Sequence, residues 1–208
     1  MLVDLNKFSI SRTRHPVWAK ISAIMEVFAM YPSTEWVWWL DVDAIIMTTH
    51  LDLYEHLLNP DAMRARLVAG DLLIANDRVP GNGHHSLLTG EVDPEVLFTD
   101  FKTMNPSEID IICVQDKAGF NAGSFFIRNN ALMQLFVDLW SDPILVEYAD
   151  IHWFQKEQDL FLYLMFEHPT LRKRVGWVKQ NLINAYHESR GGEQWESGDL
   201  VVHFPNCA

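Results

Sequence analysis

Asp41 and Asp43 follow directly on an apolar run at residues 36–40, and their spacing suits metal chemistry. An apolar strand that ends in Asp-x-Asp presents two carboxylates at its carboxyl end, where open α/β sheets bind ligands. Because alternate residues of an extended segment point the same way, both carboxylates can converge on one cation while Val42 packs behind them. Hard oxygen ligands suit Mg²⁺ or Mn²⁺, which usually complete their shells with substrate phosphates and water. The pattern predicts a divalent-cation site in an enzyme that handles a sugar diphosphonucleotide. The alternative is that Asp43 caps a helix, or that both acids are solvated turn residues.

His203 is a second candidate ligand, near the end of the short apolar run at residues 201–204. A histidine at the tip of such a strand could bring a neutral imidazole to the same ion. The alternative is a histidine at a strand end that is satisfied by local contacts. The long separation in sequence between His203 and the two acids leaves both interpretations open.

Glu157, Gln158 and Asp159 lie near the start of a predicted helix at residues 155–166. Residues two apart do not share a helical face, so at most one of the two acids, together with Gln158, faces a cleft. In a glycosyl transfer this position could supply a carboxylate or amide on the sugar face opposite the leaving group. The alternative is that these are ordinary acids at a helix N-terminus, favoured by the helix dipole.

Further polar residues stand in otherwise apolar surroundings. They are Gln115 and Asp116, then Asn121, Gly123 and Ser124, and finally Gln180. The glycine suggests a tight bend or a close approach of the backbone to a ligand. Amides and carboxylates there could bind sugar hydroxyls, although asparagine and glycine in a turn need no ligand to explain them.

The elements that must position these residues alternate between strand and helix. Predicted strands cover residues 36–40, 44–47, 72–75, 109–114, 124–128, 175–178 and 201–204, and predicted helices cover 16–31, 51–58, 132–140 and 155–166. Residues 78–108 show no periodicity, so we expect a long loop in which His84 and His85 are solvated rather than metal-binding. The order predicts an α/β layer fold and a single domain over residues 1–208.

Composition excludes several classes of protein. The chain has 208 residues, a formal net charge of −12 and 49% hydrophobic residues, which indicates a globular protein and argues against a nucleic-acid binder. Cys113 and Cys207 are too few for a disulfide framework, and whether they pair stays undecided. No stretch approaches the length of a membrane span and no secretory signal opens the chain, so we expect it to be soluble as written.

Five segments together resemble glycosyltransferase family 34, which contains fungal Golgi α-mannosyltransferases and α-galactosyltransferases and plant xyloglucan α-xylosyltransferases. The segments are residues 35–47, 121–128, 157–159, 180–186 and 198–204, in the family's order. They span nearly the whole chain, and their sequences most resemble the fungal mannosyltransferase branch. The resemblance implies a GT-A-like three-layer sandwich around a mixed, mostly parallel sheet. It also implies a retaining, metal-dependent transferase in the Golgi lumen, anchored in the membrane.

The resemblance also assigns roles to residues. Asp41, Asp43 and His203 would ligate Mn²⁺, with Mg²⁺ as the alternative, and the ion would bridge the donor diphosphate. The catalytic group would be Glu157, Gln158 and Asp159, with the first two near the anomeric carbon. The donor-binding group would comprise Asp41, Asp43, Gln115, Asp116, Asn121, Gly123, Ser124 and Gln180.

Family members carry an anchor, a stem and a first β-α-β unit before the equivalent of residue 1, and plant members continue past the histidine to Gly-Cys-Lys. This chain instead reads Asn206-Cys207-Ala208. We therefore expect a catalytic domain that lacks the first nucleotide-binding strands and has an unpaired sheet edge.

The expected reaction is transfer of an α-linked hexose, with mannose from GDP-mannose as first choice, onto a glycan acceptor. One alternative is an inactive structural subunit of a heteromeric mannan-polymerase complex. Another is a carbohydrate-binding module that uses the eight tryptophans.

Overall fold

The computed structural model describes residues 15–68, 104–189 and 191–205. The predicted strand at 72–75, most of the predicted loop at 78–108 with His84 and His85, and Cys207 lie outside the described residues.

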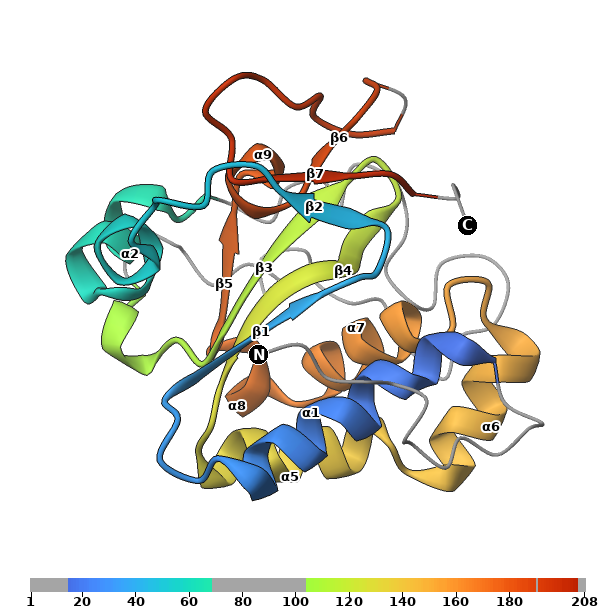
Figure 1. The fold of residues 1–208 in the computed structure, drawn as a ribbon. Coiled ribbons are helices and arrows are strands. Elements are labelled where there is room, and N and C mark those ends of the chain that lie inside the picture. Colours follow the sequence, from blue (N-terminus) through green and yellow to red (C-terminus); the bar gives the residue numbers. More distant parts are fainter. Residues whose placement is uncertain (1–14, 69–103, 190, 206–208) are drawn as a thin grey trace.

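The centre of the molecule is a mixed four-stranded sheet (Figure 1). Its strands are β1 (Trp36–Leu40), β4 (Gly119–Arg128), β3 (Ile111–Asp116) and β5 (Val175–Val178), in that spatial order. The β1·β4 and β4·β3 ladders are antiparallel, whereas β3 and β5 run parallel. Both β3 and β4 are buried almost throughout, as expected of central strands that are covered on both faces.

A smaller sheet lies beside the ends of these strands (Figure 1). It consists of β2 (Ala44–Ile46), β7 (Val201–His203) and β6 (Ala185–Tyr186), in that order. β2 pairs antiparallel with β7, and β6 pairs parallel with β7. This sheet joins the segment after β1 to the end of the described chain, which lies far from it in sequence.

Helices cover one face of the central sheet, and a mixed layer covers the other (Figure 1). The helical layer consists of η2 (Pro16–Trp18), α1 (Ala19–Met30), α5 (Ala131–Trp140), α6 (Pro143–His152), α7 (Glu157–Glu167) and α8 (Pro169–Arg172). The opposite side carries η3 (Tyr54–Leu58), α2 (Pro60–Arg66), α9 (Gln180–Ile183) and the small sheet, with η4 (Pro106–Glu108) leading into β3.

The two faces have separate cores. Alternate residues of β3 divide between them, with Ile111 and Cys113 packed toward the helices and Ile112 and Val114 packed toward α2 and α9. This division follows from the two-residue period of a strand. The expected three-layer α/β architecture is confirmed.

The expectation of a mostly parallel sheet does not describe these strands. Among the described residues, three ladders are antiparallel and two are parallel. The reason is local, since β3 and β4 form a hairpin through Lys117 and Ala118, and neighbouring strands joined by a short turn must run antiparallel.

Several element boundaries also differ from the prediction. The strand predicted at 124–128 begins earlier, so the tight bend suggested by Gly123 is absent and this residue lies inside β4. The chain turns at Lys117 and Ala118 instead. Helix α6 was missed although Asp142 caps it and Pro143 opens it, which is a standard N-terminal signal. The short elements α2, α8, α9 and β6 were missed because their apolar patterns are too brief to show a period.

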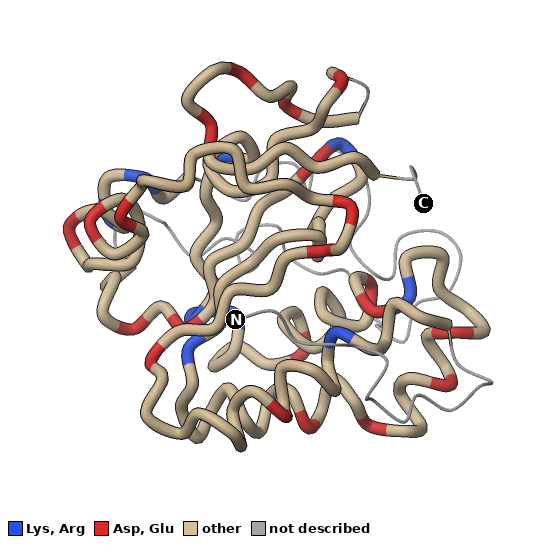
Figure 2. The backbone as a smooth tube through the Cα atoms, viewed as in Figure 1, with Lys and Arg blue, Asp and Glu red and all other residues tan. Residues whose placement is uncertain are grey.

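Charge is dispersed over the described backbone. Figure 2 shows Lys and Arg positions scattered among more numerous Asp and Glu positions. None of the helices in the described part of the chain has the length and apolar character needed to cross a membrane.

Candidate active site

The two acids of the Asp-x-Asp motif leave the central sheet at the end of β1. The backbone N–H of Asp41 still donates to the Gly123 carbonyl of β4 (2.8 Å), and the chain then turns, with the Ala44 N–H donating to the Asp41 carbonyl (3.1 Å). Val42 at the top of this turn is 94% exposed, so the prediction that it packs behind the acids was wrong. The turn replaces the expected extended segment because the chain changes sheets here, from β1 to β2.

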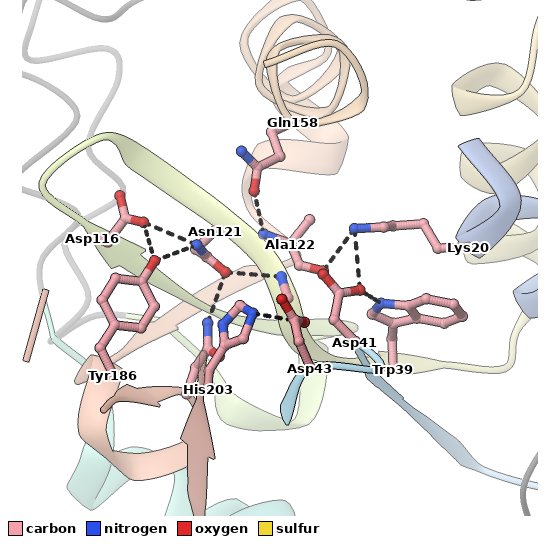
Figure 3. A network of polar contacts seen from close by, with 12 residues as sticks. Lys20, Trp39, Asp41, Asp43, Asp116, Asn121, Ala122, Gln158, Tyr186 and His203 are labelled. Carbon is pink, nitrogen blue, oxygen red and sulfur yellow. Dashed lines mark hydrogen bonds and ion pairs between the residues drawn. The ribbon is translucent and has the colours of Figure 1, made fainter. Parts of the chain in front are cut away.

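His203 reaches the acids through the small sheet. The β2·β7 register sets His203 opposite Ala44, the residue after Asp43, and the Phe204 N–H donates to the Asp43 carbonyl (2.9 Å). The His203 Nε2 atom then lies 3.2 Å from Asp43 Oδ1. One ligand atom each from Asp41, Asp43 and His203 lies within 4.8 Å of the others (Figure 3).

This donor set fits a small divalent cation. Around an octahedral ion with ligands at about 2.1 Å, neighbouring ligand atoms are roughly 3 Å apart, close to the observed Nε2–Oδ1 distance. Asp41 Oδ1 already accepts the indole N–H of Trp39 (2.6 Å), which leaves its second oxygen for an ion. Two carboxylates and one imidazole could together hold a divalent metal ion.

Gly123 makes room for the histidine. A Cβ built on this residue would lie 2.4 Å from His203 Cε1 and 2.9 Å from Asn121 Oδ1. The group that approaches the backbone closely here is the His203 ring, whereas the sequence suggested a close approach to a ligand. The buried Nδ1 atom of His203 has no hydrogen-bond partner among the described residues.

A buried polar network lies beside His203. The Tyr186 hydroxyl donates to Asp116 Oδ2 (2.5 Å) and accepts from Asn121 Nδ2 (2.6 Å), which also donates to Asp116 (2.9 Å). The edge of the Tyr186 ring packs on His203, with ring centroids 5.6 Å apart. Burial, then the charge of Asp116 and the hydrogen bond to it, raise the pKa of Tyr186 well above its ordinary value. Tyr186 therefore acts here as a neutral donor.

The same network ties three segments together. Asn121 Oδ1 accepts the Gly123 N–H (2.9 Å) and the side-chain amide of Asn184 (2.8 Å). The end of β3 at Asp116, the strand β4 with Asn121 and Gly123, and the segment that begins at Asn184 are thus joined by one network. Neither Tyr186 nor Asn184 was predicted as a site residue, because an aromatic or amide residue near a strand is common in sequence.

Lys20 is a further residue that sequence reasoning missed. It projects from α1 and is 5% exposed, with Nζ 3.1 Å from Glu157 Oε1, 3.1 Å from the Ala122 carbonyl and 3.5 Å from Asp41 Oδ1. The sequence does contain a sign that Lys20 is unusual. It shares a helical face with Val17 and Ile24 in an otherwise apolar stripe.

The acids and the amide at the start of α7 divide as expected of neighbours on a helix. Glu157 is 5% exposed and faces Lys20, and Gln158 Oε1 accepts the Ala122 N–H of β4 (2.7 Å). Asp159 turns away, and its Oδ2 accepts the Gln155 N–H (2.8 Å). For Asp159 the structure favours the alternative of an ordinary acid in the first turn of a helix, where the helix dipole favours it.

The remaining predicted residues contact other parts of the chain. Ser124 Oγ accepts the Trp38 indole N–H (3.0 Å), and Gln180 accepts the Glu193 N–H (2.8 Å) and donates to the Asn184 carbonyl (3.1 Å). These contacts join strands and loops rather than entering the carboxylate cluster. Gln115 is buried at the end of β3.

Comparison with known proteins places this geometry in context. A family model described as the galactosyl transferase GMA12/MNN10 family matches residues 1–208. The probable alpha-1,2-galactosyltransferase gmh2 of Schizosaccharomyces pombe is 35% identical over 191 residues, 92% of this chain and 51% of gmh2. The probable alpha-1,6-mannosyltransferase MNN10 of Saccharomyces cerevisiae is 30% identical over 201 residues, 91% of this chain and 46% of MNN10. The chain spans about half the length of the curated relatives it matches.

A solved structure has a similar fold. The crystal structure of a glycosyltransferase involved in the glycosylation of the major capsid of PBCV-1 matches with a TM-score of 0.55 and 13% sequence identity. The match covers 97% of this chain and 75% of that one. At this identity the likeness concerns the fold alone.

Proposed function

Since the chain belongs to the galactosyl transferase GMA12/MNN10 family, glycosyltransferase family 34, as its five segments predicted, we propose that it carries the catalytic site of a metal-dependent, retaining hexosyltransferase. The donor would be a nucleotide-activated hexose and the acceptor a glycan. The single observation that carries the proposal is the convergence of Asp41, Asp43 and His203 within 4.8 Å of one another.

The ligand residues would hold Mn²⁺, or Mg²⁺, against the donor diphosphate. A divalent cation bound there supplies charge neutralisation for the departing diphosphate. Asp41 and Asp43 provide hard oxygen ligands, and His203 provides a neutral nitrogen held in place by Gly123 and Tyr186. These residues are pre-positioned, which is how an electrostatic site avoids reorganisation during the reaction.

Glu157 and Gln158 would act on the sugar. Gln158 accepts the Ala122 N–H of β4 directly. Glu157 pairs with Lys20, which in turn donates to the Ala122 carbonyl. A carboxylate at this position stabilises positive charge that develops at the anomeric carbon. Retention of configuration follows either from front-face attack or from a double displacement that uses Glu157, and the geometry leaves both routes open.

The sugar is proposed from the relatives' names. Mannose from GDP-mannose is the hexose expected from the sequence, and the 30% identity to a probable alpha-1,6-mannosyltransferase supports it. Galactose is the other candidate, and it is supported by the higher identity of 35% to gmh2, a probable alpha-1,2-galactosyltransferase. A Golgi lumenal location and a heteromeric glycosyltransferase complex are proposed from the resemblance to the family. The alternative of an inactive structural subunit is disfavoured by the intact ligand set.

Calorimetric titration tests the proposal. GDP-mannose and UDP-galactose are titrated in parallel, with and without Mn²⁺, into the unmodified protein, Asp43→Asn and the control Asp61→Asn on α2. We expect one donor to bind in the presence of Mn²⁺, Asp43→Asn to abolish that binding because it removes a charged ligand, and Asp61→Asn to leave it unchanged. Mn²⁺-dependent donor binding that persists in Asp43→Asn would contradict the assignment of Asp43 as a metal ligand. Binding without any transfer to a mannoside acceptor would favour the inactive subunit.

A further inference from the structure

Lys20 stands where the metal cluster meets the proposed catalytic helix. Its ammonium lies close to the carboxylates of Asp41 and Glu157, and it also donates to the Ala122 carbonyl. Figure 3 shows Lys20 with Asp41 and Ala122. These partners come from the end of β1, the start of α7 and the middle of β4. One side chain therefore joins three separate segments around the site.

The position favours an apolar residue on packing grounds alone. Lys20 is buried on the face of α1 that also buries Ile24, beside Ile21. Removing an ammonium from water is costly unless it is paired and hydrogen-bonded, and a leucine or methionine would fill the same space without that cost. A lysine here is therefore best explained by its charge.

The contacts of Lys20 constrain the two carboxylates differently. Asp41 Oδ1 accepts the Trp39 indole N–H at 2.6 Å and lies 3.5 Å from Lys20 Nζ. The closer contact of this carboxylate is therefore the one with Trp39. Glu157 is closer to Lys20, at 3.1 Å, and its side chain is 6% exposed. Among the described residues, Lys20 is the cationic partner of Glu157.

We propose that Lys20 is a positioning residue that fixes the Glu157 carboxylate relative to the metal-binding Asp41 and compensates part of the negative charge between them. The inference rests on the proposed function, because it takes Asp41 as a metal ligand and Glu157 as the group that faces the sugar. A role that depends on the charge of Lys20 has a consequence that a role in packing alone does not have. Loss of the charge impairs turnover, and at the same time it removes a repulsive neighbour of the metal.

Lys20→Met keeps most of the apolar bulk and removes the charge. Titration with MnCl₂ alone should show binding that is unchanged or tighter by roughly 3- to 30-fold, the size expected for removing a nearby like charge in a partly solvated site. Donor turnover should fall about 100-fold in kcat, with a smaller change in donor KM, because an electrostatic contribution to the transition state is lost. A merely structural role would instead weaken Mn²⁺ binding and turnover together.

The control is Arg128→Met. Arg128 forms an ion pair with Asp110 (3.4 Å) at the far end of β4, so its loss removes a comparable ion pair away from the cluster. We expect it to lower thermal stability without changing Mn²⁺ affinity or kcat.

A double-mutant cycle tests the pairing itself, without any turnover. Lys20→Met, Glu157→Gln and the double variant are compared by denaturant unfolding, and the two changes should be non-additive, with the double variant more stable than the sum of the single losses predicts. Additive losses, or weaker Mn²⁺ binding in Lys20→Met, overturn the inference. If the unmodified protein turns over neither GDP-mannose nor UDP-galactose, the proposed function fails, while the metal titration and the cycle still decide on Lys20.

Discussion

His203 is held by its neighbours on three sides. Asp43 lies 3.2 Å from its Nε2 atom, the Tyr186 ring packs edge-on against it, and the Gly123 backbone approaches its Cε1 atom too closely for any side chain. Neighbours of this kind set the orientation of a metal-ligating histidine, and such supporting contacts often matter nearly as much as the ligand itself. In the part of the chain that the structure describes, the support comes from packing and from a strand that carries glycine, rather than from a hydrogen bond to Nδ1.

The substitution Gly123→Ala tests this support. A methyl group 2.4 Å from His203 Cε1 must displace the ring, so Mn²⁺ affinity measured by calorimetry should fall about 10-fold or more. The matched control is Gly176→Ala on β5, whose new Cβ would lie 2.8 Å from Leu67 Cδ2 in the core on the α2 and α9 side of the sheet. That variant should lose thermal stability and keep its Mn²⁺ affinity. Equal affinities in the two alanine variants would show that the ring is not held by Gly123.

At the scale of elements, the start of α7 decides where Glu157 and Gln158 point. Lys156, just before this helix, has a φ of 45°, a conformation that costs energy for any residue with a side chain. Its Nζ donates to the Asp150 carbonyl (2.9 Å) and pairs with the Asp150 carboxylate (3.2 Å), which in turn accepts the Trp18 indole N–H. These contacts hold a turn from which Glu157 points toward Lys20.

Two variants of Lys156 separate backbone strain from the contacts of its side chain. Lys156→Ala and Lys156→Gly both remove the pairing with Asp150, but only glycine adopts a positive φ without steric cost. We expect the glycine variant to be more stable than the alanine variant by about 1 kcal/mol in denaturant unfolding. The opposite ranking would mean that the turn is not strained in solution.

At the scale of the molecule, the site exists only because two sheets meet. β1 of the central sheet delivers Asp41, and the β2·β7 ladder of the small sheet brings His203 to the turn that carries Asp43. A ligand that bridges these parts binds the folded state and not the unfolded chain, so it stabilises the fold. The net charge of −12 adds a general attraction for cations, and specificity must come from the ligand geometry.

Mn²⁺ should therefore raise the melting temperature. At a free concentration 100-fold above Kd the free energy of unfolding rises by about 2.7 kcal/mol, which corresponds to roughly 5–10 °C for a chain of this size. A chelator should reverse the shift. Differential scanning calorimetry of Asp43→Asn provides the control, since a rise of the same size in this variant would indicate that Mn²⁺ binds elsewhere.

The sequence by itself determined the elements and the residues whose chemistry is local. The apolar run before Asp41 gave β1, the run before His203 gave β7, and the amphipathic pattern around residues 132–140 gave α5, because burial imposes a period that survives in sequence. The acids of the Asp-x-Asp motif stood out for the same reason, as charges that end an apolar strand. The five family segments also identified the family, since their order along the chain needs no structure to be read.

Only the tertiary structure decided which residues meet. Strand register brought His203 beside Asp43, placed Gly123 under the ring and set Tyr186 next to Asp116, and no local pattern encodes a ladder between distant segments. Lys20 shows most clearly what the sequence could not predict. Its place in an apolar helical stripe marked it as unusual. Its partners Asp41 and Glu157 were identified only in the folded structure, where α1, β1 and α7 pack together. A buried charge is defined by its partners, and those partners are supplied by long-range packing.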